Sequence, residues 1–339
     1  MLKRRYFHPA FVCISLACLL LSACGRNGGR ALEVVYVSAP QAILRDHMAA
    51  VYTKTGVVKN GDRLEVLERD RRFVKVRTAK NEEGWLEDRY VVSQQVYDGF
   101  QKLKQQEAND AVQAAGTTRN DTNIHLTPGR ETDHLFLLSE GAKVSILKRA
   151  TVAKSNALAA VKPVADAKGN VTTPPVPMED WWLIRDPQGD VGWVLARLVD
   201  VDIPLDIAQY AEGQRIVACF VLDQVTDGDK QVPQYLVVLS EPRDGMPFDY
   251  NQIRVFTWNV RKHRYETAYH ERDLNGVLPV TVTQENFDKE GMLPVFILHV
   301  KDDQGNTIDR KYKLNTPIVR RVLAPGEERP TAVSRKKRH

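Results

Sequence analysis

Short runs in which apolar and polar residues alternate dominate the chain from about residue 34 onwards. Leu64 and Val66 alternate with charged residues, and Val74 and Val76 do the same. This period of two is typical of strands that bury one face and expose the other. Glycines separate many of the runs, as expected at turns. The pattern predicts an all-β protein made of several small units.

Two segments of the chain repeat the same pattern. Residues 42–67 align with residues 122–147 at a constant offset of 80 positions. Residues 73–91 align with residues 181–199 at an offset of 108. The second copy therefore carries 28 additional residues in one connection, within an insertion at 150–180. Such self-similarity is typical of a duplicated structural unit.

Each copy has a glycine before a strand and a Gly-Trp pair near its end. Gly61 and Gly141 lie where a turn must precede a strand, and Gly84 and Gly192 lie where we expect the chain to bend. The tryptophan after each bend is expected to pack inward. A barrel of about 60 residues buries little surface, so one large aromatic side chain matters to it.

The stretches GDRLEVL, FVKVR and GWL of the first copy resemble the bacterial SH3-like domain, and matching stretches recur in the second copy. The resemblance covers residues 34–92 and 117–202. It implies two small β-barrels in tandem, from a family whose members bind peptide or glycan elements, often of the cell wall. The second copy has His125 where the family usually has arginine, so we carry over no binding pocket.

A segment rich in helix formers joins the two copies at 93–116. Its apolar residues Val96, Phe100 and Leu103 form a stripe at helical spacing. We expect a helical linker over the whole segment, packed against a barrel and ended by Gly116.

Strand-like runs also fill residues 204–323. Aromatic strands flank the short turn at 260–264, which predicts a hairpin with cross-strand aromatic pairs. We expect a C-terminal β-sandwich or barrel domain here, then a disordered basic tail at 324–339. The insertion at 150–180, rich in alanine, lysine, valine and proline, is expected to be an extended surface loop.

The first residues have the layout of an export signal. Three cations precede an apolar run at 10–23, whose helix would span roughly 21 Å, whereas a bilayer core needs about 30 Å. The stretch LSAC resembles the lipobox of bacterial lipoproteins, which implies removal of 1–23, acyl chains on Cys24 and a flexible tether at 24–33. Gly25 then implies the outer membrane, on its periplasmic side. An ordinary cleaved signal is the alternative.

Charge and side-chain chemistry narrow the function classes. The net charge is +5, and without the cations of the signal and the tail the body lies near −2, which argues against a nucleic-acid binder. Cys219 is the one thiol of the folded part, and its apolar strand predicts a small core residue. His263 and His270 are expected on different faces of a hairpin, so we expect no metal, no cofactor and no catalytic site.

Two aromatic residues are candidate binding residues. Strand alternation places Trp182, aligned with Val74, in the core, and Trp181, aligned with Phe73, at the surface. A surface indole often belongs to a contact face, so Trp181 and Phe73 are either binding residues or residues packed under the insertion.

These observations predict a non-catalytic envelope lipoprotein that binds or tethers cell-wall peptide or glycan, or envelope proteins, through its two barrels. The first alternative is a scaffold lipoprotein that docks a protein partner through its C-terminal β domain. A peptidoglycan hydrolase is the second alternative, and it lacks a recognisable nucleophile or metal motif. The ligand and the oligomeric state stay open.

Overall fold

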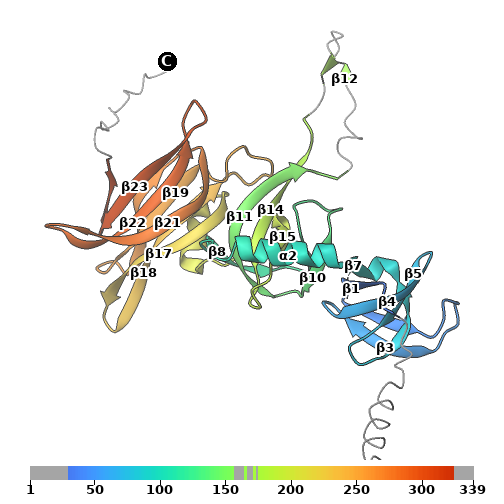
Figure 1. Cartoon of the computed structure of the whole chain (residues 1–339). Helices are drawn as coiled ribbons and strands as arrows, with labels where there is room; N and C mark the ends of the chain where they lie inside the picture. The colour runs from blue at the N-terminus through green and yellow to red at the C-terminus, as the bar shows by residue number, and fades with distance from the viewer. Residues whose placement is uncertain (1–29, 156–163, 166–170, 173–174, 324–339) are drawn as a thin grey trace, which may run out of the picture.

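The computed structural model describes residues 30–155, 164–165, 171–172 and 175–323. Figure 1 shows three β units in a row, with one long helix, α2, lying along the middle unit and pointing to the first. The predicted all-β class is confirmed. The predicted signal, Cys24 and the basic tail from 324 onwards lie outside the described residues. Among the described residues, no helix has the length and apolar character needed to span a bilayer.

The first barrel, residues 33–93, is one curved seven-stranded sheet in the order β3-β2-β6-β5-β4-β1-β7. Alternate residues of these strands, such as Val35, Leu64 and Val74, fill a single core. The strands and the short 3₁₀ turn η2 are β1 (Glu33–Val37), β2 (Gln41–Arg45), β3 (Lys54–Lys59), β4 (Arg63–Asp70), β5 (Phe73–Arg77), β6 (Glu83–Glu87), η2 (Asp88–Tyr90) and β7 (Val91–Ser93).

The second barrel, residues 114–201, follows the same order strand for strand, β10-β9-β15-β14-β11-β8-β16. The equivalence between the copies seen in the sequence therefore extends to backbone pairing. Its elements are β8 (Ala114–Thr118), β9 (Thr122–His125), β10 (His134–Leu138), β11 (Lys143–Ala153), β14 (Met178–Arg185), β15 (Val191–Leu195), η3 (Ala196–Leu198) and β16 (Val199–Val201).

Gly84 and Gly192 lie inside strands β6 and β15, not at bends as expected. A Cβ on Gly84 would lie 2.8 Å from Leu44 Cβ, and one on Gly192 would lie 2.3 Å from Ile124 Cγ2. Both glycines thus allow a neighbouring strand to approach closely, at equivalent positions of the two barrels.

The tryptophans that follow these glycines face outward, which corrects the expectation that they pack inward. Trp85 pairs with Lys75, whose neighbours Val74 and Val76 both point into the core. Because directly paired residues share one face of a sheet, Trp85 lies on the outer face. Trp193 has the same position in the second barrel, paired with Leu183.

The linker is a helix, α2 (Gln94–Gln106), that ends ten positions before the expected stop at Gly116. Its N-cap is Ser93, whose side chain accepts a hydrogen bond from Val96 N. The alanine-rich end of the linker is strand β8, in which a Cβ on Gly116 would lie 2.8 Å from Val199 Cγ1. Pairing with β11 and β16 overrides the helix propensity of alanine.

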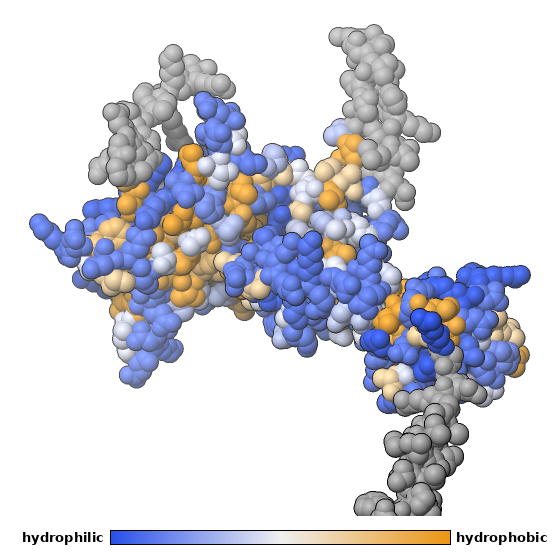
Figure 2. Space-filling model, viewed as in Figure 1, coloured by the Kyte–Doolittle hydropathy of each residue, from blue (hydrophilic) through white to orange (hydrophobic). Residues whose placement is uncertain are grey.

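The helix connects both barrels through its buried face. Tyr97 stacks on Tyr36 of the first barrel, with ring centroids 3.9 Å apart. Phe100 is 2% exposed and lies in the core of the second barrel. Figure 2 shows a continuous hydrophilic surface over the helix position, as expected of an amphipathic helix with one face in solvent.

The described ends of the insertion at 150–180 are strands, where an extended loop was expected, and residues 156–163, 166–170 and 173–174 lie outside the described residues. Its first and last residues continue β11 and β14, and the pairing extends from Ala150–Trp181 to Ala153–Met178. The β-branched residues Thr151 and Val152 suit such pairing. Two further short strands, β12 (Val164–Ala165) and β13 (Val171–Thr172), pair with each other.

The C-terminal unit is a sandwich of two four-stranded meanders, which decides between the expected sandwich and barrel. Side chains from both sheets, including Val238, Val255, Phe296 and Tyr312, share one core. The first sheet contains β17 (Arg215–Asp227), β18 (Lys230–Ser240), β19 (Gln252–Asn259) and β20 (Arg264–Glu271); the second contains β21 (Gly276–Phe287), β22 (Gly291–Lys301), β23 (Thr307–Asn315) and β24 (Ile318–Val322).

The predicted aromatic hairpin is β19–β20, where Trp258 pairs with Tyr265 at a ring distance of 5.0 Å. The outer face of this first sheet is also apolar. It is covered by a short segment with a helical turn, α4 (Leu205–Ala208), and a 3₁₀ turn, η4 (Gln209–Ala211), in which Ile207 is buried.

Candidate functional site

The outer face of the first barrel carries a cluster of one arginine and three aromatic residues, which we call the Arg45 face: Arg45, Tyr52, Phe73 and Trp85. The guanidinium carbon of Arg45 lies 4.3 Å from the ring centroid of Tyr52 and 5.7 Å from that of Phe73. Arg45 is also paired with Trp85 in the sheet register. These distances are those of cation–π contacts.

Three local features position this cluster. Arg45 is the last residue of β2, and Phe73 is the first residue of β5, after a turn in which Arg71 adopts a left-handed conformation, with φ of 52°. Tyr52 lies in the loop that Asp46 closes, since Asp46 Oδ1 accepts from Thr53 N at 2.8 Å. That amide hydrogen bond is the main reason why the pKa of Asp46 is lowered.

The Arg45 face is partly accessible to solvent, although Trp85 itself is only 9% exposed. The side chains of Arg45 and of its ion-pair partner Glu87, 3.5 Å away, are 23% and 25% exposed. Phe73 and Tyr52 are half-buried. Phe73 was expected at the surface, and the structure places it at the rim of this cluster.

The equivalent cluster of the second barrel is covered. His125 takes the position of Arg45 and is paired with Trp193, and its ring packs edge-on against Trp181 at 5.1 Å. Burial, reinforced by the nearby His134, lowers the pKa of His125 to about 4, so its ring is neutral at physiological pH.

Trp181 is 2% exposed, which corrects the expectation of a surface indole; Trp182 is equally buried. Alternation correctly puts Trp182 in the barrel core, and Trp181 is on the outer face, but that face is covered. Two residues before Trp181 on the same face, Glu179 accepts two hydrogen bonds from Arg130 Nε, at 2.8 and 3.1 Å. Trp181 is therefore a packing residue of the second barrel.

Helix α2 covers the rest of this face. Leu103 packs with Trp193 beside the buried residues Leu147, Leu183 and Val191. Lys104 Nζ lies 3.0 Å from Asp190 Oδ1 at the edge of the same contact. Of the two equivalent outer faces, the one on the second barrel holds the helix, and no helix packs on the other within the described residues.

The side chains that were weighed for catalysis are held apart. Cys219 is half-buried in β17, and burial raises its pKa to about 11, which makes it a poor nucleophile at neutral pH. His263 Nδ1 lies 2.7 Å from Asp227 Oδ2 in a turn, whereas His270 Nε2 accepts from Arg272 Nε. Within the described ranges, no three His, Cys, Asp or Glu side chains gather as a metal site.

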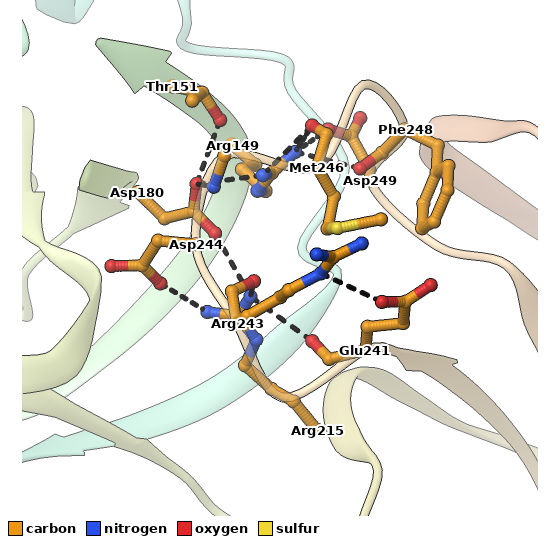
Figure 3. Close-up of polar contacts among 11 residues, drawn as sticks. Arg149, Thr151, Asp180, Arg215, Glu241, Arg243, Asp244, Met246, Phe248 and Asp249 are labelled. Atoms are coloured by element: carbon orange, nitrogen blue, oxygen red, sulfur yellow. Dashed lines mark hydrogen bonds and ion pairs between the residues drawn. The ribbon is translucent and has the colours of Figure 1, made fainter. Parts of the chain in front are cut away.

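A buried charge network joins the second barrel to the sandwich (Figure 3). Asp180 of β14 has a fully buried side chain; its Oδ1 accepts from Arg149 Nη2 at 2.7 Å, and its Oδ2 accepts from Arg215 Nη2 of β17 at 3.0 Å. Arg149 Nη1 continues to the carbonyl of Phe248 at 2.9 Å and to Asp249 Oδ1 at 3.1 Å. The network therefore fixes the 241–249 loop of the sandwich on the barrel.

A second joint lies at Gln113, which has no exposed surface. Its Oε1 accepts from Val280 N of β21 at 2.7 Å, and its backbone carbonyl accepts from Cys219 N of β17 at 3.2 Å. One apolar cluster also runs from the second barrel into the sandwich. The second barrel and the sandwich are thus one packed body.

Sequence reasoning found Phe73 through its alignment with Trp181 but missed Arg45, Tyr52 and the Asp180 network. The repeat offered a signal for Arg45, because the same alignment that pairs Phe73 with Trp181 pairs Arg45 with His125. Tyr52 and Asp180 are placed by a loop and by tertiary contacts, for which the sequence holds no local pattern.

Comparison with known proteins supports the resemblance of the first barrel to the bacterial SH3 domain. Residues 42–92 match the family model described as the bacterial SH3 domain. No curated protein matches the chain significantly.

Similar solved structures include an NlpC/P60 family protein from Bacillus cereus ATCC 10987, 11% identical, with a TM-score of 0.22 over 57% of this chain and 65% of that one. NlpC2 from Trichomonas vaginalis is 9% identical, with a TM-score of 0.17, over 71% of this chain and 97% of that one. NlpC1 from the same organism is 9% identical, with a TM-score of 0.16, over 72% and 89%. Structural similarity with TM-scores this low supports no conclusion about activity.

Proposed function

We propose that this protein is a non-catalytic cell-envelope protein whose first barrel binds cell-wall peptide or glycan through the Arg45 face. The observation that supports it is the asymmetry between two equivalent faces. Helix α2 and the Arg130–Glu179 pair cover the outer face of the second barrel. The Arg45 face lies in the segment that matches the bacterial SH3 domain, and Arg45, Tyr52 and Phe73 there stay partly accessible.

The chemistry of the Arg45 face suits such a ligand. The guanidinium of Arg45 offers fork-shaped donors to carboxylates, which occur in wall peptides, and to hydroxyl groups. The rings of Tyr52 and Phe73 offer apolar faces and edges against which a sugar ring or a methyl-bearing side chain packs. The second barrel and the sandwich form the rigid body from which helix α2 presents the first barrel.

Co-sedimentation of the purified full chain with isolated cell-wall sacculi tests this function. We expect saturable retention of the wild type, and roughly tenfold weaker binding of Phe73→Ala and of Arg45→Ala, since each removes an anchor worth more than about 1 kcal/mol. The matched control is Phe287→Ala on the sandwich, because Phe287 is also half-buried and lies 4.4 Å from a lysine ammonium. Wild-type sedimentation no greater than without sacculi would refute the proposal, as would equal binding of all four proteins.

We further propose that the chain is anchored in the envelope by acyl chains on Cys24. Two or more acyl chains give stable attachment, since each buried CH₂ contributes about 0.8 kcal/mol. We expect the wild type to partition into the detergent phase of a Triton X-114 extract and to incorporate a clickable palmitate analogue. Cys24→Ser should lose the label, and with residues 1–23 removed it should also leave the detergent phase, whereas Cys219→Ser should keep both properties. Label incorporation by Cys24→Ser would contradict the anchor.

A further inference from the structure

The outer face of the first sandwich sheet is apolar, although it lies on the side of the sheet that points away from the shared core. The solvent side of an antiparallel sheet ordinarily carries polar residues. Here buried apolar side chains from all four strands form a cluster on that side: Ile216, Tyr235, Val237, Leu239, Phe256 and Tyr265. An apolar sheet face of this kind is typical of a contact surface.

The cover of this face is a short segment, residues 203–213, which we call the strap. It contains α4 and η4 and leads from the second barrel into β17. Its one buried residue is Ile207, 1% exposed, whereas Leu205 is 87% exposed. Tyr210, three residues after Ile207, packs on Phe256 with ring centroids 5.2 Å apart. The strap therefore holds the face with two side chains at helical spacing.

One ion pair fastens the strap to the sheet. Arg254 of β19 is 6% exposed. Its Nη1 donates to Glu212 Oε1 and to the carbonyl of Tyr210, both at 2.9 Å, and its Nη2 donates to Glu212 Oε2 at 2.6 Å. The side chain of Glu212 is itself 58% exposed. The pair thus joins a buried cation of the sheet to an exposed carboxylate of the strap.

The backbone of the strap is not part of the sheet. Within the described residues, no backbone amide or carbonyl of the strap pairs with a strand backbone. The strap ends at Glu212 and Gly213 in left-handed conformations, with φ of 52° and 78°, and such segment ends can absorb a change of direction. Segments with few buried side chains and no ladder hydrogen bonds open locally while the rest of a protein stays folded.

We propose that the strap is a displaceable cover, and that the face beneath it binds the same motif from a protein partner. The motif is an aliphatic residue, an aromatic residue three positions later and a carboxylate two positions after that. The strap carries it as Ile207, Tyr210 and Glu212. The carboxylate is required because a lifted strap leaves Arg254 without its acid, and a buried cation needs a partner.

Alkylation of Cys219 by iodoacetamide reports the opening of the strap. Cys219 packs in the same outer-face cluster, and it is the only thiol of a chain that lacks residues 1–23 and carries Cys24→Ser. Burial raises its pKa to about 11, so it reacts slowly while the strap is closed. Ile207→Ala and Glu212→Ala should each react roughly tenfold faster, because each removes a contact that exists only in the closed state.

Three controls separate local opening from other effects. Leu205→Ala removes an exposed side chain of the strap and should leave the rate unchanged. Val300→Ala, at a position 2% exposed in the shared core of the two sheets, lowers the stability of the sandwich without touching the strap. It should accelerate alkylation far less than Ile207→Ala. Phe73→Ala should leave the rate unchanged, which separates the strap from wall binding by the Arg45 face.

The strap supplied as a separate peptide tests the partner motif. A tethered segment acts at an effective concentration on the order of millimolar, so a free peptide competes best with a weakened strap. A peptide of residues 203–213 with blocked ends, at about 1 mM, should slow the alkylation of Cys219 in Ile207→Ala severalfold. The same peptide carrying Ile207→Asp or Glu212→Gln should not slow it.

Equal rates for Ile207→Ala and Val300→Ala would show that Cys219 reacts only when the whole sandwich unfolds, and would overturn the proposal. Rates unchanged by Ile207→Ala and Glu212→Ala would do so as well. A strap peptide that does not slow alkylation, or that slows it equally with Glu212→Gln, would refute the partner motif.

Discussion

Asp180→Ala is expected to lower the free energy of unfolding of the second barrel and sandwich by about 3–5 kcal/mol. The variant leaves Arg149, whose side chain is 5% exposed, buried without its main carboxylate partner. It also removes the acceptor for Thr151 Oγ1 at 2.8 Å and for Gly245 N at 3.1 Å. Arg149 keeps Asp249 Oδ1 at 3.1 Å, but a buried cation that loses its nearest carboxylate is still far more destabilising than the loss of a surface ion pair.

Urea unfolding of the full chain, followed by tryptophan fluorescence, measures this effect. The matched control is Asp200→Ala, which removes an exposed ion pair with Arg119 and should change stability by less than about 1 kcal/mol. Equal midpoints for the two variants would show that the network does not hold the joint together.

The carboxylate of Asp180 also makes the free energy of unfolding depend on pH. Burial alone would raise the pKa of Asp180, but the hydrogen bond and charge of Arg149, with Gly245 and Thr151, hold the pKa below its usual value. A lowered pKa in the folded state means that the stabilisation is complete above about pH 4 and is lost as the pH falls through the folded pKa. Asp180→Ala should therefore flatten the acid limb of the stability profile.

Phe100→Ala is expected to cost about 3–5 kcal/mol, because it empties a site in the core of the second barrel. The ring packs edge-on against Phe136 at 5.3 Å and lies beside Gly192, where a Cβ would be 3.1 Å from Phe100 Cε1. Helix α2 would lose its main anchor, and the covered outer face of the second barrel would be exposed.

Urea unfolding again provides the measurement, with Lys102→Ala on the solvent side of the same helix as the control. Lys102→Ala should be neutral, since alanine and lysine are both good helix formers. Increased accessibility of tryptophan to acrylamide in Phe100→Ala would show that the helix covers Trp193. An unfolding midpoint equal to that of Lys102→Ala would contradict the role of Phe100.

Periodicity and the repeat were sufficient to predict the strands, because one-sided burial imposes a period of two on each of them. They also predicted the start of α2, where Ser93 caps an amphipathic stripe. They placed the end of that helix wrongly. Residues 114–118 are small and alanine-rich, and only their pairing with β11 and β16 makes them a strand.

The candidate site was partly predictable. Alignment of the copies put Phe73 and Trp181 in equivalent places, and alternation put both on the outer face. Whether such a face is covered depends on tertiary packing, here on Arg130, Glu179 and α2, and no local pattern reports it.

The central claim is that the Arg45 face is the surface that contacts the cell wall. Amide hydrogen exchange of the full chain, with and without soluble peptidoglycan fragments, tests it most directly. We predict that added protection is confined to residues 45–53 and 73–87 of the first barrel. Protection that appears only in the second barrel or the sandwich, or no protection at saturating fragment, would contradict the account.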